Sequence, residues 1–199
     1  MNAIRLLLLS VLTIGGSLGS VAAQVRAVRI PAPRVFQDYA PRNKLEEFGT
    51  RLETVLIKGS AYIGTLTTRT GSARVSAVEI RDTGNSTQAA GVEITVNETA
   101  PAAVEVRSLI DYEEIDALIR AIDTVAKADD TITKLTHFET RYRTKGDFEV
   151  VVFKETPGGV AVAVDSGFLD TNRILLTLDD LTKLRWMIVQ AKARLDEIK

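Results

Sequence analysis

The sequence predicts an α+β fold in which antiparallel β-sheets pack against two amphipathic helices. Apolar residues in the closing stretch, 177–199, recur at alternating steps of three and four, which is the spacing of one face of an α-helix. A similar pattern follows Asp111. Much of the remaining chain alternates with a period of two between Gly-containing turns, as hairpin strands do. The apolar seam of the closing stretch consists of Leu181, Leu184, Ile188, Ala191, Leu195 and Ile198.

Capping residues mark the expected start of both helices. Thr177 and Asp180 have the spacing of a capping box at the start of the closing helix, and Asp111 and Glu114 have the same spacing at the start of the earlier one. Each helix would bury its stripe on a sheet, because packing and not propensity stabilises such helices. The stripe expected for the earlier helix consists of Ile115, Leu118, Ile119, Ile122, Val125 and Ala126.

The segments before the two helices also resemble each other. A shift of 66 residues aligns Arg107–Asp111 with Arg173–Thr177 and brings the two helices into register. This repeat predicts a structural duplication, with about four strands and a helix in each half. The halves would span residues 50–129 and 130–199. The alternative is that two capped amphipathic helices align by chance.

The amino-terminal residues have the features of an export signal. Arg5 precedes an apolar run at 6–14, and the small residues Val21-Ala22-Ala23 follow as a cleavage pattern. We therefore expect residues 1–23 to be a signal peptide and the protein to be exported, either periplasmic or extracellular. Glycines interrupt the apolar run, which argues against a stable membrane anchor after signal removal.

Composition excludes several function classes. The chain has no Cys, so thiol catalysis and Cys-based metal sites are absent. Its 25 Lys and Arg nearly balance its 26 Asp and Glu, for a net charge of −1. Such a balance gives no broad positive field, and we expect no nucleic-acid partner. The 45% of hydrophobic residues suffices for one core.

A proline-rich extended arm, 24–42, is expected to precede a single globular domain, 43–199. Prolines exclude regular helix and most sheet positions, while apolar residues predict that the arm docks. Asn43 would cap a short helix that stops at Gly49. The prolines and apolar residues of the arm are Pro31, Pro33, Val35, Phe36, Tyr39 and Pro41.

Nine strand segments are expected in the domain. The first two would form a hairpin around Gly59-Ser60, although residues 44–58 also fit a single helix. A run of apolar residues on both faces predicts that the strand at 148–154 is central. In chain order the segments are 54–58, 61–67, 73–82, 90–97, 103–109, 135–144, 148–154, 160–165 and 173–177.

No catalytic, cofactor or metal site is predicted, and we expect no enzyme activity. His137 is the one histidine, and no serine lies in a nucleophile-elbow pattern, so a surface role is expected for it. Gly158-Gly159 has the features of a strand turn and not of a phosphate loop. Asn85 and Asn97 each begin a glycosylation pattern, which matters only in a host that glycosylates exported chains.

Two surface patches remain as candidates for interaction. The first is Trp186 with Val189 and Ala193, which form an apolar stripe opposite the seam of the closing helix. Either the arm covers this stripe or another chain binds it. The second and weaker candidate is a basic cluster with one aromatic residue, for which a solvated strand face is the alternative. It consists of Arg141, Tyr142, Arg143 and Lys145.

The repeated order of about four strands and a helix over residues 50–199 resembles, in element order, the Whirly and PUR-type proteins, which bind single-stranded nucleic acid. No motif accompanies the resemblance, and fold analogy does not establish function. Three functions stay open. The first is an exported, non-catalytic domain that binds a protein or envelope component, and the second is a small-molecule binder with a pocket between sheet and helices. The third is an enzyme that uses carboxylates, although no pair of them can be placed together from the sequence. A single-stranded nucleic-acid binder, which rests on the analogy of element order alone, is a lower alternative.

Overall fold

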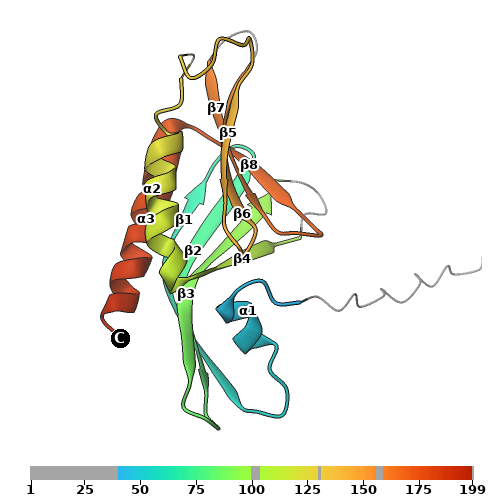
Figure 1. Cartoon of the computed structure of the whole chain (residues 1–199), viewed down its shortest axis with the longest axis vertical. Helices are drawn as coiled ribbons and strands as arrows, with labels where there is room; N and C mark the ends of the chain where they lie inside the picture. Colours follow the sequence, from blue (N-terminus) through green and yellow to red (C-terminus); the bar gives the residue numbers. More distant parts are fainter. Residues whose placement is uncertain (1–39, 100–103, 130, 156–158, 199) are drawn as a thin grey trace, which may run out of the picture. The chain divides into compact units, whose positions relative to one another are not determined.

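The computed structural model describes residues 40–99, 104–129, 131–155 and 159–198. These residues form two four-stranded antiparallel sheets and three helices, so the predicted α+β class is confirmed (Figure 1). The predicted signal peptide and the arm up to residue 39 lie outside the described residues. In chain order the elements are α1 (Lys44–Gly49), β1 (Leu56–Thr67), β2 (Gly71–Asp82), β3 (Gln88–Glu98), β4 (Val106–Asp111), α2 (Tyr112–Val125), β5 (Glu139–Arg143), β6 (Phe148–Lys154), β7 (Val160–Ser166), β8 (Asn172–Leu176) and α3 (Leu178–Asp196).

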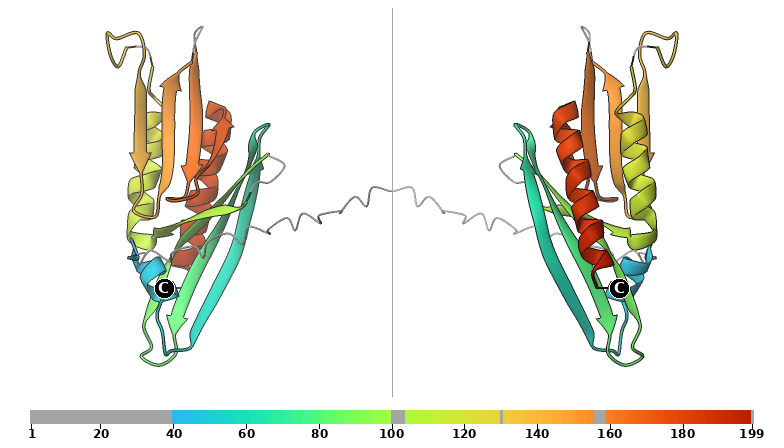
Figure 2. Two further views of the ribbon diagram at one scale, coloured as in Figure 1. Left: turned by 90° about the vertical axis from the view of Figure 1, so that its right-hand side faces the viewer. Right: turned by 90° about the vertical axis from the view of Figure 1, so that its left-hand side faces the viewer.

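The two sheets have the same construction. In sheet A the strands follow the order β1-β2-β3-β4, and in sheet B the order is β5-β6-β7-β8. The last strand of each sheet continues directly into a helix, α2 after β4 and α3 after β8. In Figure 2 the strands of sheet B (orange) stand beside α2 and α3, and the long strands of sheet A (teal and green) slant past them. The structure therefore contains two similar four-stranded sheets.

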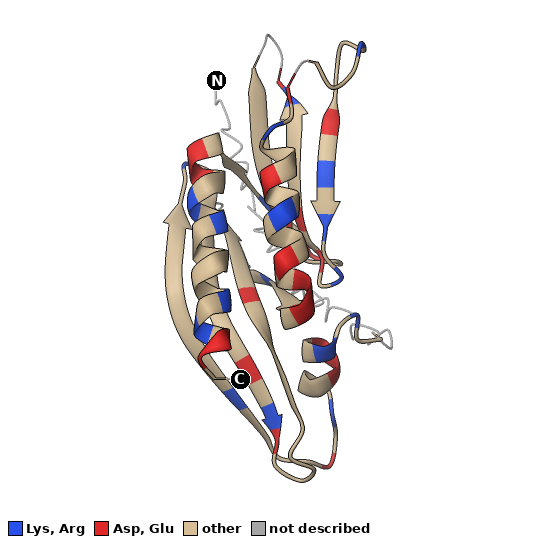
Figure 3. Cartoon of the chain, turned by 60° about the vertical axis from the view of Figure 1, so that its left-hand side comes forward, with Lys and Arg blue, Asp and Glu red and all other residues tan. Residues whose placement is uncertain are grey.

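Helices α2 and α3 run antiparallel, side by side (Figure 3). Arg185 holds Asp123 with two hydrogen bonds of 2.6 and 2.8 Å, and further along the pair Tyr112 donates to Asp196. One hydrophobic core lies between these helices and both sheets. The predicted seam residues Leu181, Leu184, Ile188, Ala191 and Leu195 are all buried in it, while Ile198 is 43% exposed because α3 has already ended.

Asp111 and Glu114 do not form the predicted capping box, although the box of Thr177 and Asp180 is present at the start of α3. The Asp111 carboxylate instead accepts hydrogen bonds from the backbone N–H groups of Lys44 and Leu45, at 2.9 and 3.0 Å. Glu114 accepts one from the backbone N–H of Lys145. The box prediction was wrong because both carboxylates bind backbone groups distant in sequence.

The predicted hairpin around Gly59-Ser60 is also wrong. Strand β1 runs through both residues, and its register with β2 is regular there, with Gly59 opposite Glu79. A hairpin at this point would have removed the pairing with β1 from half of the twelve-residue strand β2, which would then have been paired with β3 alone. The alternative of one helix over 44–58 fails as well, since α1 ends at Gly49. The predicted strand at 135–144 is shorter than expected and begins at Glu139.

Helix α1 covers the face of sheet A opposite α2 and α3 (Figure 1). Asn43 caps it as predicted, accepting a hydrogen bond from the backbone N–H of Glu46 at 2.9 Å. Leu45 approaches the sheet over Gly91, where a Cβ atom would lie 2.7 Å from the Leu45 side chain. A second, smaller hydrophobic cluster forms at this contact, and its buried members are Leu45, Phe48, Val78, Ile80 and Ala89.

Candidate functional site

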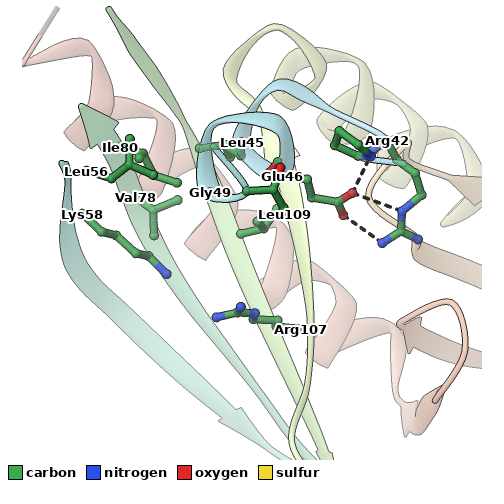
Figure 4. Close-up of a pocket in the computed structure, with 12 residues that line it drawn as sticks. Arg42, Leu45, Glu46, Gly49, Leu56, Lys58, Val78, Ile80, Arg107 and Leu109 are labelled. Carbon is green, nitrogen blue, oxygen red and sulfur yellow. Dashed lines mark hydrogen bonds and ion pairs between the residues drawn. The ribbon is translucent and has the colours of Figure 1, made fainter. Parts of the chain in front are cut away.

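A groove lies between α1 and the face of sheet A that α1 only partly covers (Figure 4). Its cavity volume is about 460 Å³. Residues from α1, the segment before and after it, and strands β1, β2 and β4 line the groove. They are Pro41, Arg42, Leu45, Glu46, Gly49, Thr50, Leu56, Lys58, Val78, Ile80, Arg107 and Leu109.

The floor of the groove is apolar. Leu56, Val78, Ile80 and Leu109 come from three strands that lie in sheet A, and their side chains share one face because successive strand residues point to opposite sides. Val78 and Ile80 are themselves buried, while Leu56 and Leu109 are partly exposed. The apolar surface that the floor offers to the groove therefore comes mainly from Leu56 and Leu109, with Val78 and Ile80 beneath.

An ion-paired cluster closes the groove at the start of α1. Arg42 donates to both carboxylate oxygens of Glu46, with its Nη2 atom at 2.8 Å from Oε1 and its backbone N at 2.8 Å from Oε2. Arg42 also forms an ion pair with Asp147, which Arg143 holds at 2.8 Å. The ion pair between Arg42 and Asp147 fixes the start of α1 to the β5–β6 turn. Two cations and two carboxylates make up the cluster, so it offers no excess charge to a ligand.

The opposite end of the groove carries Lys58 and Arg107, whose side chains point toward each other in Figure 4. Both contact the same oxygen of Glu93, a β3 residue between them. The Lys58 Nζ atom lies 2.7 Å from Glu93 Oε2, and the Arg107 Nη1 atom lies 4.0 Å from it. Two cations thus share one carboxylate at this end.

The basic cluster predicted from the sequence is divided between two faces of sheet B. Arg141 and Arg143 are exposed and pair with acidic neighbours, Arg141 with Glu139 and Arg143 with Asp147. Tyr142 points the other way and packs against the main core, and this burial raises the pKa of its hydroxyl. Lys145 lies in the β5–β6 turn. The structure therefore does not bring these four residues together as one patch.

Trp186 lies on the outer side of α3, and its side chain is 58% exposed. Val189 is partly exposed and Ala193 exposed on the same helix. The expectation that the arm covers this stripe concerns residues outside the described part of the chain. Exposure leaves the stripe as a candidate interaction surface.

The remaining candidate residues lie apart from the groove. His137 is exposed in the loop before β5, and not on a strand as predicted. Asn85 is exposed between β2 and β3, whereas Asn97 is partly buried in β3. Gly159 has a positive φ of 133°, as a turn requires, while Gly158 lies outside the described residues.

Across the described ranges, no group of three or more His, Asp or Glu side chains could hold a metal ion. Of the helices in these ranges, none has the length and apolar character needed to span a membrane. Comparison of the chain with protein-family models, with curated proteins and with solved structures finds no match.

Sequence reasoning missed the groove residues. Lys58, Glu93 and Arg107 are separated by 35 and 14 positions and come from three strands, so only the register of sheet A brings them together. In β3 and β4, Glu93 and Arg107 occupy the positions that alternate with buried residues, so neither breaks the strand pattern. Charged residues on strands are ordinarily read as solvent-facing, and for that reason they did not stand out.

Proposed function

We propose that this chain is an exported, non-catalytic domain that binds a small apolar constituent of the cell envelope in the groove between α1 and sheet A. The observation that carries the proposal is that the groove has both the volume of a small-molecule site and an apolar floor. Its volume of about 460 Å³ falls within the range of about 300–1,000 Å³ typical of small-molecule sites. Its floor is apolar, and charged side chains lie only at its ends.

The groove also supports a binding role better than a catalytic one. The described residues that line it include no His, Ser or Cys. Its one hydroxyl, on Thr50, donates to the backbone oxygens of Glu46 and Glu47 at 3.1 Å. A nucleophile activated by a neighbouring base, which covalent catalysis needs, would have to come from elsewhere.

A thermal-shift experiment with decan-1-ol tests the proposal. Decan-1-ol has an apolar chain and no charge, and a ligand that binds the native state raises the melting temperature. We expect this rise for the wild type and for Ile57→Trp, but not for Leu56→Trp, whose indole ring would fill the groove. Ile57 is the matched control because it is exposed on the opposite face of β1. No rise in the wild type, or the same rise in all three proteins, would reject the proposal.

A second candidate function is binding of another protein through the outer side of α3. The observation that favours it is the exposed Trp186, since large aromatic residues are enriched where proteins bind one another. Trp186→Ala would then weaken binding without unfolding the domain. This function and the groove use separate surfaces and are compatible.

We also propose that the fold arose by duplication of a four-stranded sheet followed by a helix. Two similar sheets, each continuing into a helix, support a duplicated arrangement with the element order of Whirly and PUR-type proteins. We do not extend the resemblance to nucleic-acid binding, because the acidic and basic residues of this chain nearly balance. Periplasmic or extracellular localisation rests on the amino-terminal sequence pattern alone.

A further inference from the structure

We infer that the ligand of the groove is a single-chain amphiphile with a carboxylate head group, and that Lys58 and Arg107 receive this head group. The inference rests on the function proposed above and adds the chemical class of the ligand. It starts from the position of the two cations. Lys58 on β1 and Arg107 on β4 line the same groove as the apolar floor residues and lie at its end away from α1 (Figure 4).

Charge at this end is unbalanced. Lys58 and Arg107 are both positive at neutral pH, and Glu93 is the acidic residue they share. The trio therefore carries a net charge of about +1. At the α1 end, by contrast, Arg42 and Arg143 are matched by Glu46 and Asp147. An acidic head group is therefore attracted to the Lys58–Arg107 end, because the other end has no comparable excess of positive charge.

Arg107 is the cation able to turn toward a ligand. Its side chain is 67% exposed, and within the described residues its one ion pair, with Glu93, is 4.0 Å long and thus beyond hydrogen-bond range. Lys58 already makes a 2.7 Å contact with Glu93. The Glu93 side chain is only 17% exposed and lies between the two cations. Because the Arg107 guanidinium is exposed and its contact with Glu93 is long, it can form the paired hydrogen bonds that guanidinium groups make with carboxylates.

The same cations set the orientation of the ligand. A carboxylate at Lys58 and Arg107 places the attached chain over Val78, Ile80 and Leu109, toward α1. The chain leaves water for an apolar surface, and the head group stays at the exposed rim. A carboxylate deeper in the groove would lose its hydration without gaining a partner, and the free-energy penalty of burying this charge would exceed the gain from apolar contacts.

Binding of decanoate and of decan-1-ol to the full chain, measured by calorimetry at pH 7 below micelle-forming concentrations, tests the inference. We expect decanoate to bind about five- to tenfold more tightly than decan-1-ol, as one partly exposed charge-assisted contact would give. In Arg107→Gln this preference should disappear while decan-1-ol still binds. Arg81→Gln is the matched control, because Arg81 lies outside the groove and pairs with Glu79 at 2.9 Å.

The outcomes separate the inference from the function on which it rests. Equal affinity of the wild type for acid and alcohol would overturn the head-group inference and leave the groove as a site for apolar ligands. A preference that survives in Arg107→Gln, or is also lost in Arg81→Gln, would overturn it as well. Binding of neither compound would overturn both the inference and the proposed function. Unchanged melting curves of the two variants establish that they are folded.

Discussion

The Asp111 carboxylate, at the end of β4, accepts a hydrogen bond from the backbone N–H of Leu45, the first buried residue of α1, at 3.0 Å. A second bond from Lys44 N, at 2.9 Å, completes the contact. Asp111 is only 6% exposed, so both bonds are largely shielded from water. Through this contact the end of sheet A sets the position of α1, and with it one wall of the groove.

Replacing Asp111 with Ala should lower the free energy of unfolding by roughly 1–3 kcal/mol, because two backbone donors lose a charged acceptor. The amides of Lys44–Gly49 should exchange with solvent faster than in the wild type. Hydrogen exchange measures this directly. Glu113→Ala is the control, since the Lys44–Glu113 ion pair is largely exposed and its loss should leave α1 protected. Unchanged protection of α1 in Asp111→Ala would show that other contacts hold the helix.

The seam of α3 should be essential to the fold, whereas its outer side should not. Leu184→Ala or Ile188→Ala should cost roughly 2–5 kcal/mol through lost burial and a residual cavity, since neither side chain is exposed. Trp186→Ala on the same helix should cost no more than about 1 kcal/mol. Urea titration measures all three. Equal losses of unfolding free energy in Leu184→Ala and Trp186→Ala would contradict the assignment of a buried side and an exposed side to α3.

Gly91 should not tolerate a larger side chain. A Cβ atom there would lie 2.0 Å from the carbonyl oxygen of Ile110 and 2.7 Å from the Leu45 side chain. We expect Gly91→Ala to cost about 1–3 kcal/mol because strand or helix must move. Gly59→Ala provides the contrast, since a Cβ at Gly59 meets no atom within 4 Å. That variant should be neutral or slightly more stable in urea, and a loss as large as that of Gly91→Ala would refute the packing argument.

Acid should weaken the start of α3 through Asp180. A hydrogen bond from the Thr177 hydroxyl lowers the pKa of the Asp180 carboxyl below its ordinary value of 3.8, and Lys183 adds to the effect. Because the folded pKa lies below the unfolded one, the stabilisation is complete above about pH 4 and is lost as the pH falls through the folded pKa. Unfolding free energy measured between pH 7 and pH 2 should therefore fall less steeply in Asp180→Asn. Identical slopes of unfolding free energy against pH in the wild type and Asp180→Asn would show that the Asp180 carboxylate does not stabilise the fold.

Local patterns predicted the fold where local physics decides it. The α3 seam, its Thr177 cap and the Asn43 cap of α1 depend on residues within one or two turns of helix, and all three are confirmed. Gly59-Ser60 has the composition of a turn but lies inside β1, because the length of β2 decides the pairing. Asp111 has the spacing of a cap but binds residues 66 and 67 positions away.

The candidate site could not be predicted in the same way. Lys58, Glu93 and Arg107 meet only through the register of β1 with β2, β2 with β3, and β3 with β4. Nothing in the spacing of these residues specifies that register. The groove also depends on α1 lying over Gly91, which follows from a close approach between elements and not from a motif. Trp186 was found from the sequence because a single helix determines its direction.

The central claim is that the groove between α1 and sheet A is the ligand site, and an NMR titration of the full chain with decanoate tests it most directly. We predict that the largest backbone amide shifts fall on the floor and cationic end of the groove, with the Trp186 indole N–H unchanged. The residues expected to shift are Leu56, Lys58, Val78, Ile80, Arg107 and Leu109. Shifts centred on Trp186, or spread over the surface with none at these six residues, would contradict the claim.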